Sequence, residues 1–217
     1  MLKIVCISDT HEQEDKLSIP DGDVLIHSGD LTYKGSMTKL AKAADWFKSL
    51  PHKYKICVAG NHDFCFENTN HNDAVKLMED AGVIYLQDSG CQIEGLNVWG
   101  SPASPFFYNW AFNYQRGKDI KTIWDKIPDS TNVLITHGPP YMIRDEAPRG
   151  VGSFENVGCV DLMNRINNLD HLKLAVFGHI HSAYSEKPIL INQTYFVNAS
   201  SCNEQYQPVN LPVIVEI

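Results

Sequence analysis

Five short apolar stretches, each ending in a polar turn, constrain the fold of this chain more than any other feature. Each is four to six residues long and rich in Val, Ile and Leu, and they cover residues 2–7, 23–26, 54–58, 132–135 and 173–177. This length and composition are typical of buried β-strands. A turn containing Asp, Asn or His follows each stretch. The polar side chains of the chain are thus concentrated at predicted strand ends.

Helical patterns lie between these strands. Apolar residues spaced three and four positions apart predict amphipathic helices at residues 36–50, 72–81, 118–127 and 159–169. Alternating strands and helices predict an α/β fold. Further apolar segments without intervening helices predict a second sheet region packed on the first, at residues 91–93, 97–99, 189–191, 195–197 and 213–217. No linker or repeat interrupts the pattern, so we expect a single domain over residues 1–217.

The charge balance restricts the partners. With 26 acidic and 18 basic residues the chain carries a formal charge of −8, which argues against binding to duplex nucleic acid. No apolar run approaches the ~18 residues of a membrane span, and no membrane partner is expected. A small phosphate ester stays possible, because bound metal ions supply positive charge locally.

Two further features favour a cytoplasmic location. The apolar run at residues 4–7 is shorter than the core of a signal peptide and ends in charge rather than in a series of small residues. The six cysteines are scattered, and no two form a C-x-x-C pair. We therefore expect reduced thiols in a cytoplasmic protein.

The polar turns predict a metal centre. In open α/β sheets ligands bind beyond the carboxyl ends of the strands, so these turns should converge. Any one of these side chains alone would be ordinary, but their occurrence at five strand ends is not. The candidate metal ligands are Asp9, His11, Asp30, Asn61, His137, His179 and His181.

This ligand set is too large for one ion. Two carboxylates, one amide oxygen and four imidazoles suit first-row divalent metals, and Asp30 can bridge two ions through its two oxygens. Paired ions of this kind occur in hydrolytic phosphatases and nucleases. The set contains no thiolate, which argues against a structural zinc site.

The motifs resemble a known superfamily. In chain order they read Asp9-x-His11, Gly29-Asp30, Gly60-Asn61-His62-Asp63, Thr136-His137-Gly138 and Gly178-His179-Ile180-His181. This series is similar to the calcineurin-like metallophosphoesterases over residues 9–181. The segments 99–102, 110–112, 116–117 and 137–140 look like the MPPED-like branch, which is similar to class III cyclic nucleotide phosphodiesterases. The resemblance implies a four-layer αββα sandwich of two mixed sheets flanked by helices, with the metal site at the strand C-terminal ends.

The resemblance also implies individual roles. One divalent ion (Mn, Fe, Zn, Co or Ni, with Mn expected in vitro) would bind Asp9, His11, Asp30 and His181. A second would bind Asp30, Asn61, His137 and His179. A water activated by the metals would attack phosphorus.

The third motif would supply further groups. His62 would contact the phosphate together with Asn61 and would protonate the leaving alkoxide as a general acid. Asp63 would orient the His62 ring.

The function implied is a dinuclear-metal phosphodiesterase acting on cyclic nucleotides or other nucleotide diesters. His179 is intact where some members of the branch carry Gly, so we expect full activity. A phosphomonoesterase or nucleotidase using the same site, and a non-catalytic nucleotide-binding scaffold, stay open as alternatives.

Related classes fit less well. Protein phosphatases of the superfamily continue Gly-Asp with a second Asp and an Arg, where this chain has Tyr33 and Lys34, and they have Glu in place of Asp63. The metallo-β-lactamase motif His-x-His-x-Asp-His is absent.

Two long segments between the motifs have open roles. Residues 102–117 hold six aromatic residues and either pack on the body as a loop or form a rim that stacks a base. In the second case Phe107 and Trp110 would border the cleft and Arg116 would reach the phosphate or base. Residues 139–158, with Arg144 and Arg149, predict a long loop that is either functional or a plain connection.

Overall fold

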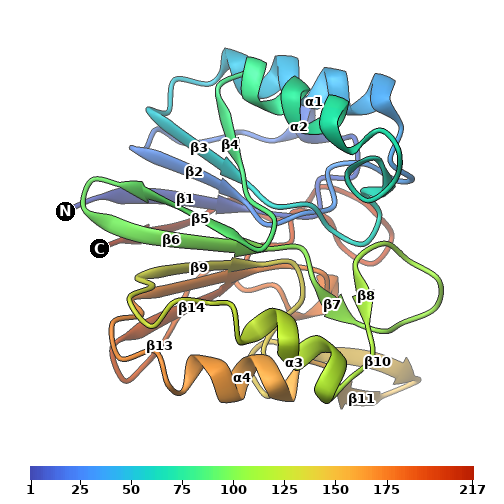
Figure 1. Cartoon of the computed structure of the whole chain (residues 1–217). Helices are drawn as coiled ribbons and strands as arrows, with labels where there is room; N and C mark the ends of the chain where they lie inside the picture. The colour runs from blue at the N-terminus through green and yellow to red at the C-terminus, as the bar shows by residue number, and fades with distance from the viewer.

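The computed structural model describes residues 1–217 and shows two β-sheets packed face to face between two helical layers (Figure 1). In the first sheet β1 to β4 run parallel, and β15 pairs antiparallel with β1 at one edge. Its strand order is β15 (Val213–Glu216), β1 (Lys3–Ile7), β2 (Val24–His27), β3 (Tyr54–Cys57) and β4 (Val83–Tyr85).

The second sheet has parallel inner strands and an antiparallel strand at each edge. Its order is β13 (Ile189–Ile191), β14 (Thr194–Asn198), β12 (Leu174–Phe177), β9 (Val133–Thr136), β6 (Leu96–Ser101) and β5 (Ser89–Ile93). The αββα sandwich of two mixed sheets is thus confirmed. The grouping of strands differs from the prediction, because β9 and β12 join the second sheet while β1, β2 and β3 form the first. An apolar run marks a strand as buried but does not identify its neighbours.

Two helices cover each outer face, at the four positions where the sequence predicts helices (Figure 1). α1 (Met37–Ser49) and α2 (His71–Asp80) lie on the first sheet, and α3 (Lys118–Trp124) and α4 (Val160–Ile166) on the second. Three short 3₁₀ turns follow polar loops: η1 (Glu14–Lys16), η2 (Phe64–Phe66) and η3 (His181–Ala183). None of the helices is long and apolar enough to cross a membrane.

The alternation of side chains along β1 explains the layers. Ile4 and Cys6 belong to the core between the two sheets, whereas Val5 and Ile7 belong to the core beneath α1 and α2. Because successive strand residues point to opposite faces, a strand buried on both faces must be apolar throughout. A third core, which includes Trp124, joins the second sheet to α3 and α4.

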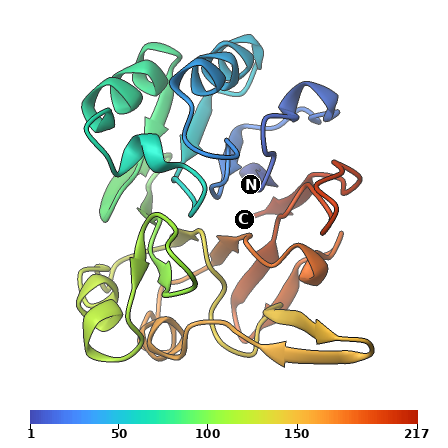
Figure 2. The same ribbon diagram turned by 90° about the vertical axis from the view of Figure 1, so that its right-hand side faces the viewer.

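The two long segments contain strands that the sequence did not predict. Residues 139–158 include a hairpin of β10 (Glu146–Gly150) and β11 (Ser153–Asn156), which extends from the lower edge of the body (Figure 2). Residues 102–117 include the short pair β7 (Ser104–Pro105) and β8 (Asn113–Tyr114). The hairpin is largely exposed and contains Pro148, so it lacks the apolar alternation that marks a strand in a sequence.

Candidate active site

The carboxyl ends of strands from both sheets meet on the right-hand side of Figure 1, which faces the viewer in Figure 2. Asp9, Asp30 and Asn61 follow β1, β2 and β3 of the first sheet. His137 follows β9, and His179 and His181 follow β12, in the second. The site therefore lies across the junction of the two sheets, rather than along the edge of one.

Asp30 lies at the centre of this group. Its Oδ2 atom is 3.5 Å from Nε2 of His137, 3.7 Å from Nε2 of His11 and 4.0 Å from Nε2 of His62. Its Oδ1 atom accepts a hydrogen bond of 2.9 Å from the backbone N–H of His62. A carboxylate surrounded in this way is placed to bridge two cations.

Asp9 forms a second group with His11 and His181. Its Oδ1 atom is 3.3 Å from Nε2 of His181, and this nitrogen is 3.3 Å from Nε2 of His11. Asp9, His11 and His181 form one of three sets of potential ligand atoms that lie within 4.8 Å of one another. The other two are His11, Asp30 and His62, and Asp9, Asp30 and His137. His62, which the resemblance did not assign as a ligand, thus lies at ligand distance.

Asn61 and His179 complete the predicted set. Oδ1 of Asn61 is 2.9 Å from Nε2 of His137. The ring of His179 lies edge-on to that of His137, with 4.9 Å between centroids. It is outside the three closest sets, although its backbone N–H donates to both oxygens of Asp9 at 3.1 and 3.0 Å.

Backbone carbonyls orient three of the imidazoles. Nδ1 of His62 lies 2.8 Å from the carbonyl oxygen of Tyr33, Nδ1 of His137 lies 3.0 Å from that of Ser28, and Nδ1 of His181 lies 2.9 Å from that of Asn203. An oxygen acceptor there requires the proton on Nδ1 and leaves Nε2 facing the site.

Asp63 does not have the predicted role of orienting the His62 ring. Its carboxylate accepts hydrogen bonds from the backbone N–H groups of Leu31, Thr32 and Gly60, at 3.1, 2.8 and 2.9 Å. Burial raises the pKa of this carboxyl to about 6. Asp63 therefore fixes the turn that carries Asp30 and the turn that carries Asn61. Adjacency to His62 in the chain did not reveal that the two side chains point apart.

The charges of the site reinforce one another. Burial opposes ionisation of Asp9 and Asp30, but nearby imidazoles, above all His181 and His137 respectively, hold the pKa of both carboxyls well below the usual range. Burial likewise opposes protonation of His137, yet the Asp30 carboxylate raises the pKa of its ring to about 9. Burial lowers the pKa of His11 to about 4 and that of His179 to about 3. Ionised carboxylates therefore face neutral His11 and His179 rings and a protonated His137 ring, whose proton a divalent cation would displace on binding.

The backbone is strained at the same positions. Asp9, His11, Asp30 and His179 have φ angles of 52°, 45°, 58° and 69°, in the left-handed region that residues other than Gly rarely adopt. Such strain persists where the surroundings enforce it and is concentrated at functional sites.

Glycines allow the turns to approach the carboxylates. A Cβ atom on Gly60 would lie 2.2 Å from Oδ1 of Asp30, and one on Gly178 would lie 2.1 Å from Oδ2 of Asp9. Gly138, which follows His137, has no comparable constraint, since its added Cβ would meet nothing closer than 3.6 Å.

The residues fit two divalent cations. Nε2 of His11 and Nε2 of His181 face each other at 3.3 Å beside the Asp9 carboxylate, an arrangement of lone pairs that a shared cation stabilises. Carboxylate, amide and imidazole donors together suit first-row divalent ions. One cation would be held by Asp9, His11, Asp30 and His181, and the other by Asp30, Asn61, His137 and His179.

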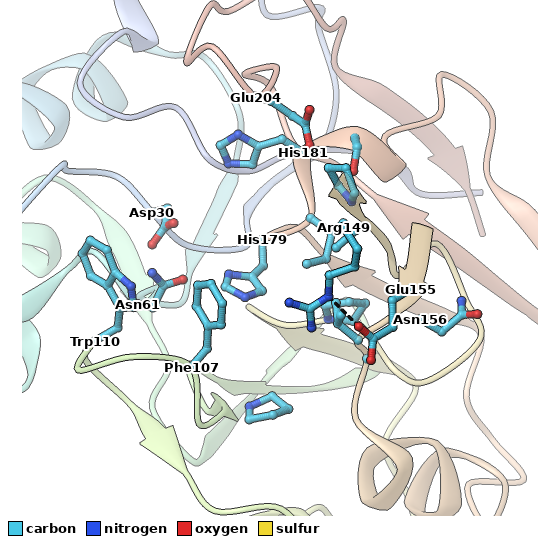
Figure 3. Close-up of a pocket in the computed structure, with 18 of the residues that line it drawn as sticks. Asp30, Asn61, Phe107, Trp110, Arg149, Glu155, Asn156, His179, His181 and Glu204 are labelled. Carbon is cyan, nitrogen blue, oxygen red and sulfur yellow. Dashed lines mark hydrogen bonds and ion pairs between the residues drawn. The ribbon is translucent and has the colours of Figure 1, made fainter. Parts of the chain in front are cut away.

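A cleft of about 550 Å³ extends from this centre. The potential metal ligands lie at one end, residues of the 102–117 segment form one wall, and the β10–β11 hairpin forms the other (Figure 3). Phe107 and Trp110 both line it, as expected if the segment is a rim. The Trp110 ring also packs against the His62 ring, with 4.2 Å between centroids and 32° between planes.

Arg116 lines the cleft but does not reach toward a phosphate, contrary to expectation. Its guanidinium donates to the backbone carbonyls of Val157 and Gly158. Both terminal nitrogens are engaged there, so Arg116 fastens the second long segment to the first. Backbone carbonyls that need a side-chain donor leave no pattern in the sequence, so this contact of Arg116 could not be predicted.

The sequence predicted no role for the cleft residues Tyr206 and Glu204, which follow the last motif, or for Glu155 on the hairpin, and it left the role of Arg149 open. The ring of Tyr206 lies edge-on to His11, with 4.8 Å between centroids, and 5.5 Å from His181. Glu204, Arg149 and Glu155 also line the cleft. No motif marked Tyr206, and the hydrogen bond from Gln13 that holds its carbonyl spans most of the chain.

Comparison with known proteins identifies the class. Residues 2–183 match the family model of calcineurin-like phosphoesterases, so the chain belongs to this family. It is 38% identical to metallophosphoesterase domain-containing protein 1 of Homo sapiens over 99% of this chain and 71% of that protein. A UPF0046 protein of Caenorhabditis elegans is 37% identical over 100% of this chain and 75% of its own length. These relatives place the chain in the MPPED-like branch.

Solved structures support the fold. TT1561 of Thermus thermophilus superposes with a TM-score of 0.62 at 14% identity, covering 91% of this chain and 88% of its own. At that identity the likeness shows the fold alone. Family membership and the ligand sets together define a metal-dependent phosphoester hydrolase.

Proposed function

We propose that the chain hydrolyses phosphodiesters, with cyclic nucleotides or other nucleotide diesters as substrates. The observation that carries this proposal is the placement of His62 at the metal end of a cleft much larger than a phosphate group. A diester brings two organic substituents and one negative charge. A cleft of this volume can accept such substituents, since pockets for small organic ligands measure about 300–1,000 Å³.

Charge supports a diester over a monoester. A doubly charged monoester is commonly bound by a guanidinium clamp. Here both terminal nitrogens of the Arg116 guanidinium are engaged by backbone carbonyls. Lys34, at the position of the phosphatase arginine, is exposed and is not among the cleft residues.

The chain's own groups set the course of the reaction. When bound, the two cations polarise the phosphoryl oxygens and lower the pKa of water. Nδ1–H of His62 donates to the carbonyl oxygen of Tyr33, and the Trp110 ring restrains the imidazole, so Nε2 faces the site beside Asp30 and presents a proton there when the ring is an imidazolium. From there His62 protonates the leaving alkoxide. Asn61 contributes an amide oxygen at the metal end, where this oxygen lies 2.9 Å from Nε2 of His137.

Relative activity on bis-p-nitrophenyl phosphate and p-nitrophenyl phosphate tests the proposal. With Mn²⁺ added to the full chain, we expect kcat/KM to be at least about tenfold higher for the diester. A profile confined to the monoester would overturn the phosphodiesterase assignment in favour of a phosphomonoesterase. Failure of any divalent metal to restore hydrolysis of either ester would favour a nucleotide-binding scaffold.

The cellular setting belongs to the same proposal. We infer a cytoplasmic enzyme, with Mn²⁺ as its cation in vitro. All six cysteines are free and five are buried, as expected for thiols kept reduced in the cytoplasm.

A further inference from the structure

The wall of the cleft formed by the β10–β11 hairpin carries charged side chains, Arg149 and Glu155. Pro148 pairs with Phe154 and Gly150 pairs with Ser153, so Arg149 between them has no partner across the ladder. This irregularity is a β-bulge. Bulges are frequent beside active sites, where they redirect a side chain.

The bulge presents Arg149 to the cleft. Its side chain is 52% exposed, and it lines the same cavity as the potential metal ligands His179 and His181. In Figure 3 the guanidinium of Arg149 extends from the hairpin toward the side of the cleft that holds His179 and Phe107. Phe107, 47% exposed, stands on the facing wall.

Only one nitrogen of this guanidinium has a partner. Nε of Arg149 donates to Oε2 of Glu155 at 2.5 Å, and Glu155 is itself 57% exposed. The two terminal amino groups make no hydrogen bond within the chain. Glu155 therefore steadies the side chain without consuming the pair of donors that matches the oxygens of a phosphate.

We propose that Arg149 is a specificity-determining residue that binds a second phosphate group of the substrate, separate from the diester being hydrolysed. This inference rests on the proposed phosphodiesterase function and narrows its substrate class. The substrate is a nucleotide diester whose scissile phosphate lies at the metal end. Its organic part lies along Phe107, and its additional phosphate lies at the hairpin.

Two matched esters test this. The p-nitrophenyl ester of thymidine 5′-phosphate and the same ester with an added 3′-phosphate differ only in the second phosphate group, and both release p-nitrophenol. For the wild-type chain with Mn²⁺ we expect kcat/KM to be on the order of tenfold higher for the 3′-phosphorylated ester, mostly through a lower KM. Arg149→Met should bring the ratio of the two kcat/KM values close to one.

Two further variants separate recognition from structure. Arg149→Lys keeps the charge but loses the planar pair of donors, so its ratio should lie between wild type and Arg149→Met even if the latter folds poorly. Arg144→Met removes a nearby arginine that lines a separate cavity and should leave the ratio unchanged.

The outcomes distinguish this inference from the proposed function. Equal hydrolysis of both esters by the wild type, or an unchanged ratio in Arg149→Met, would overturn the role of Arg149 while leaving the phosphodiesterase intact. Failure of the wild type to hydrolyse either ester would overturn both.

Discussion

The metal end of the cleft, here called its floor, and the exposed rim formed by residues 102–117 and the β10–β11 hairpin are built in opposite ways. On the floor, Asp9, His11 and His137 are fully buried, and Asp30 and Asn61 are 2% and 3% exposed. Asp9, His11 and Asp30 have strained backbone conformations, and backbone N–H groups or carbonyls hold the side chains of Asp9, Asp30 and His137. On the rim, Phe107 and Tyr108 are 47% and 73% exposed.

This difference separates chemistry from recognition. A floor held by the backbone has one arrangement, so damage to it should abolish function. A rim held by side-chain contacts at the surface can change without loss of the fold, so substitutions there should act by degrees.

The largest effect is expected for Asp30→Asn. Loss of one negative charge at the centre of the ligand set should release the cations and lower kcat/KM for bis-p-nitrophenyl phosphate by at least about 10³-fold. Metal content by elemental analysis and steady-state kinetics measure the two effects. Asp80→Asn, an exposed acid paired with Lys76 on α2, is the matched control. Full activity with a normal metal content in Asp30→Asn would contradict the bridging role.

His62→Ala should separate proton donation from metal binding. We expect the metal content to be retained, with kcat lowered about 10²-fold or more on a diester with an alkyl leaving group. The loss should be much smaller for p-nitrophenolate, which needs little protonation. An unchanged kcat on the alkyl ester would refute the role of His62 as general acid.

Gly60→Ala tests whether the floor has any free space. The new methyl group would overlap Oδ1 of Asp30, so we expect affinity for the cations to fall about 10–100-fold, as for other changes that displace a ligand. A metal titration measures this. Gly138→Ala, also beside a ligand but with room for the methyl group, should bind metal normally. Equal behaviour of the two variants would show that the floor relaxes more than its contacts suggest.

Trp110→Ala should give the smallest change. Losing the ring that packs on His62 should lower kcat severalfold, and losing a wall of the cleft should raise KM for a nucleotide diester by a similar factor. A kinetic comparison with wild type separates the two. An unchanged KM would show that Trp110 only supports His62.

How far the sequence predicts the structure follows the same division. The apolar runs that form β1, β2, β3, β9 and β12 fix the location of the strand ends. Asp and His side chains there indicate a metal centre because the carboxyl ends of neighbouring parallel strands lie on the same side of a sheet. The direction in which a side chain points, however, is set by contacts between segments that are distant in the chain, and the sequence does not show these contacts. Asp63 turns to the backbone of residues 31–32 and Arg116 to the carbonyls of residues 157–158.

The residues that form the rim were harder to predict from the sequence, because they lie in exposed or irregular segments. The β10–β11 hairpin is exposed and irregular, so no apolar period marks its strands. Tyr206 reaches the site through a loop that begins after β14, beyond the last motif.

The central claim is that two cations, held by the turns at the strand ends, make this chain a phosphodiesterase. Titration of metal-stripped full chain with Mn²⁺, followed by hydrolysis of bis-p-nitrophenyl phosphate, tests it most directly. We expect activity to return and to saturate at two equivalents of Mn²⁺ per chain. Saturation of activity at one equivalent, or no return of activity with any divalent metal, would contradict it.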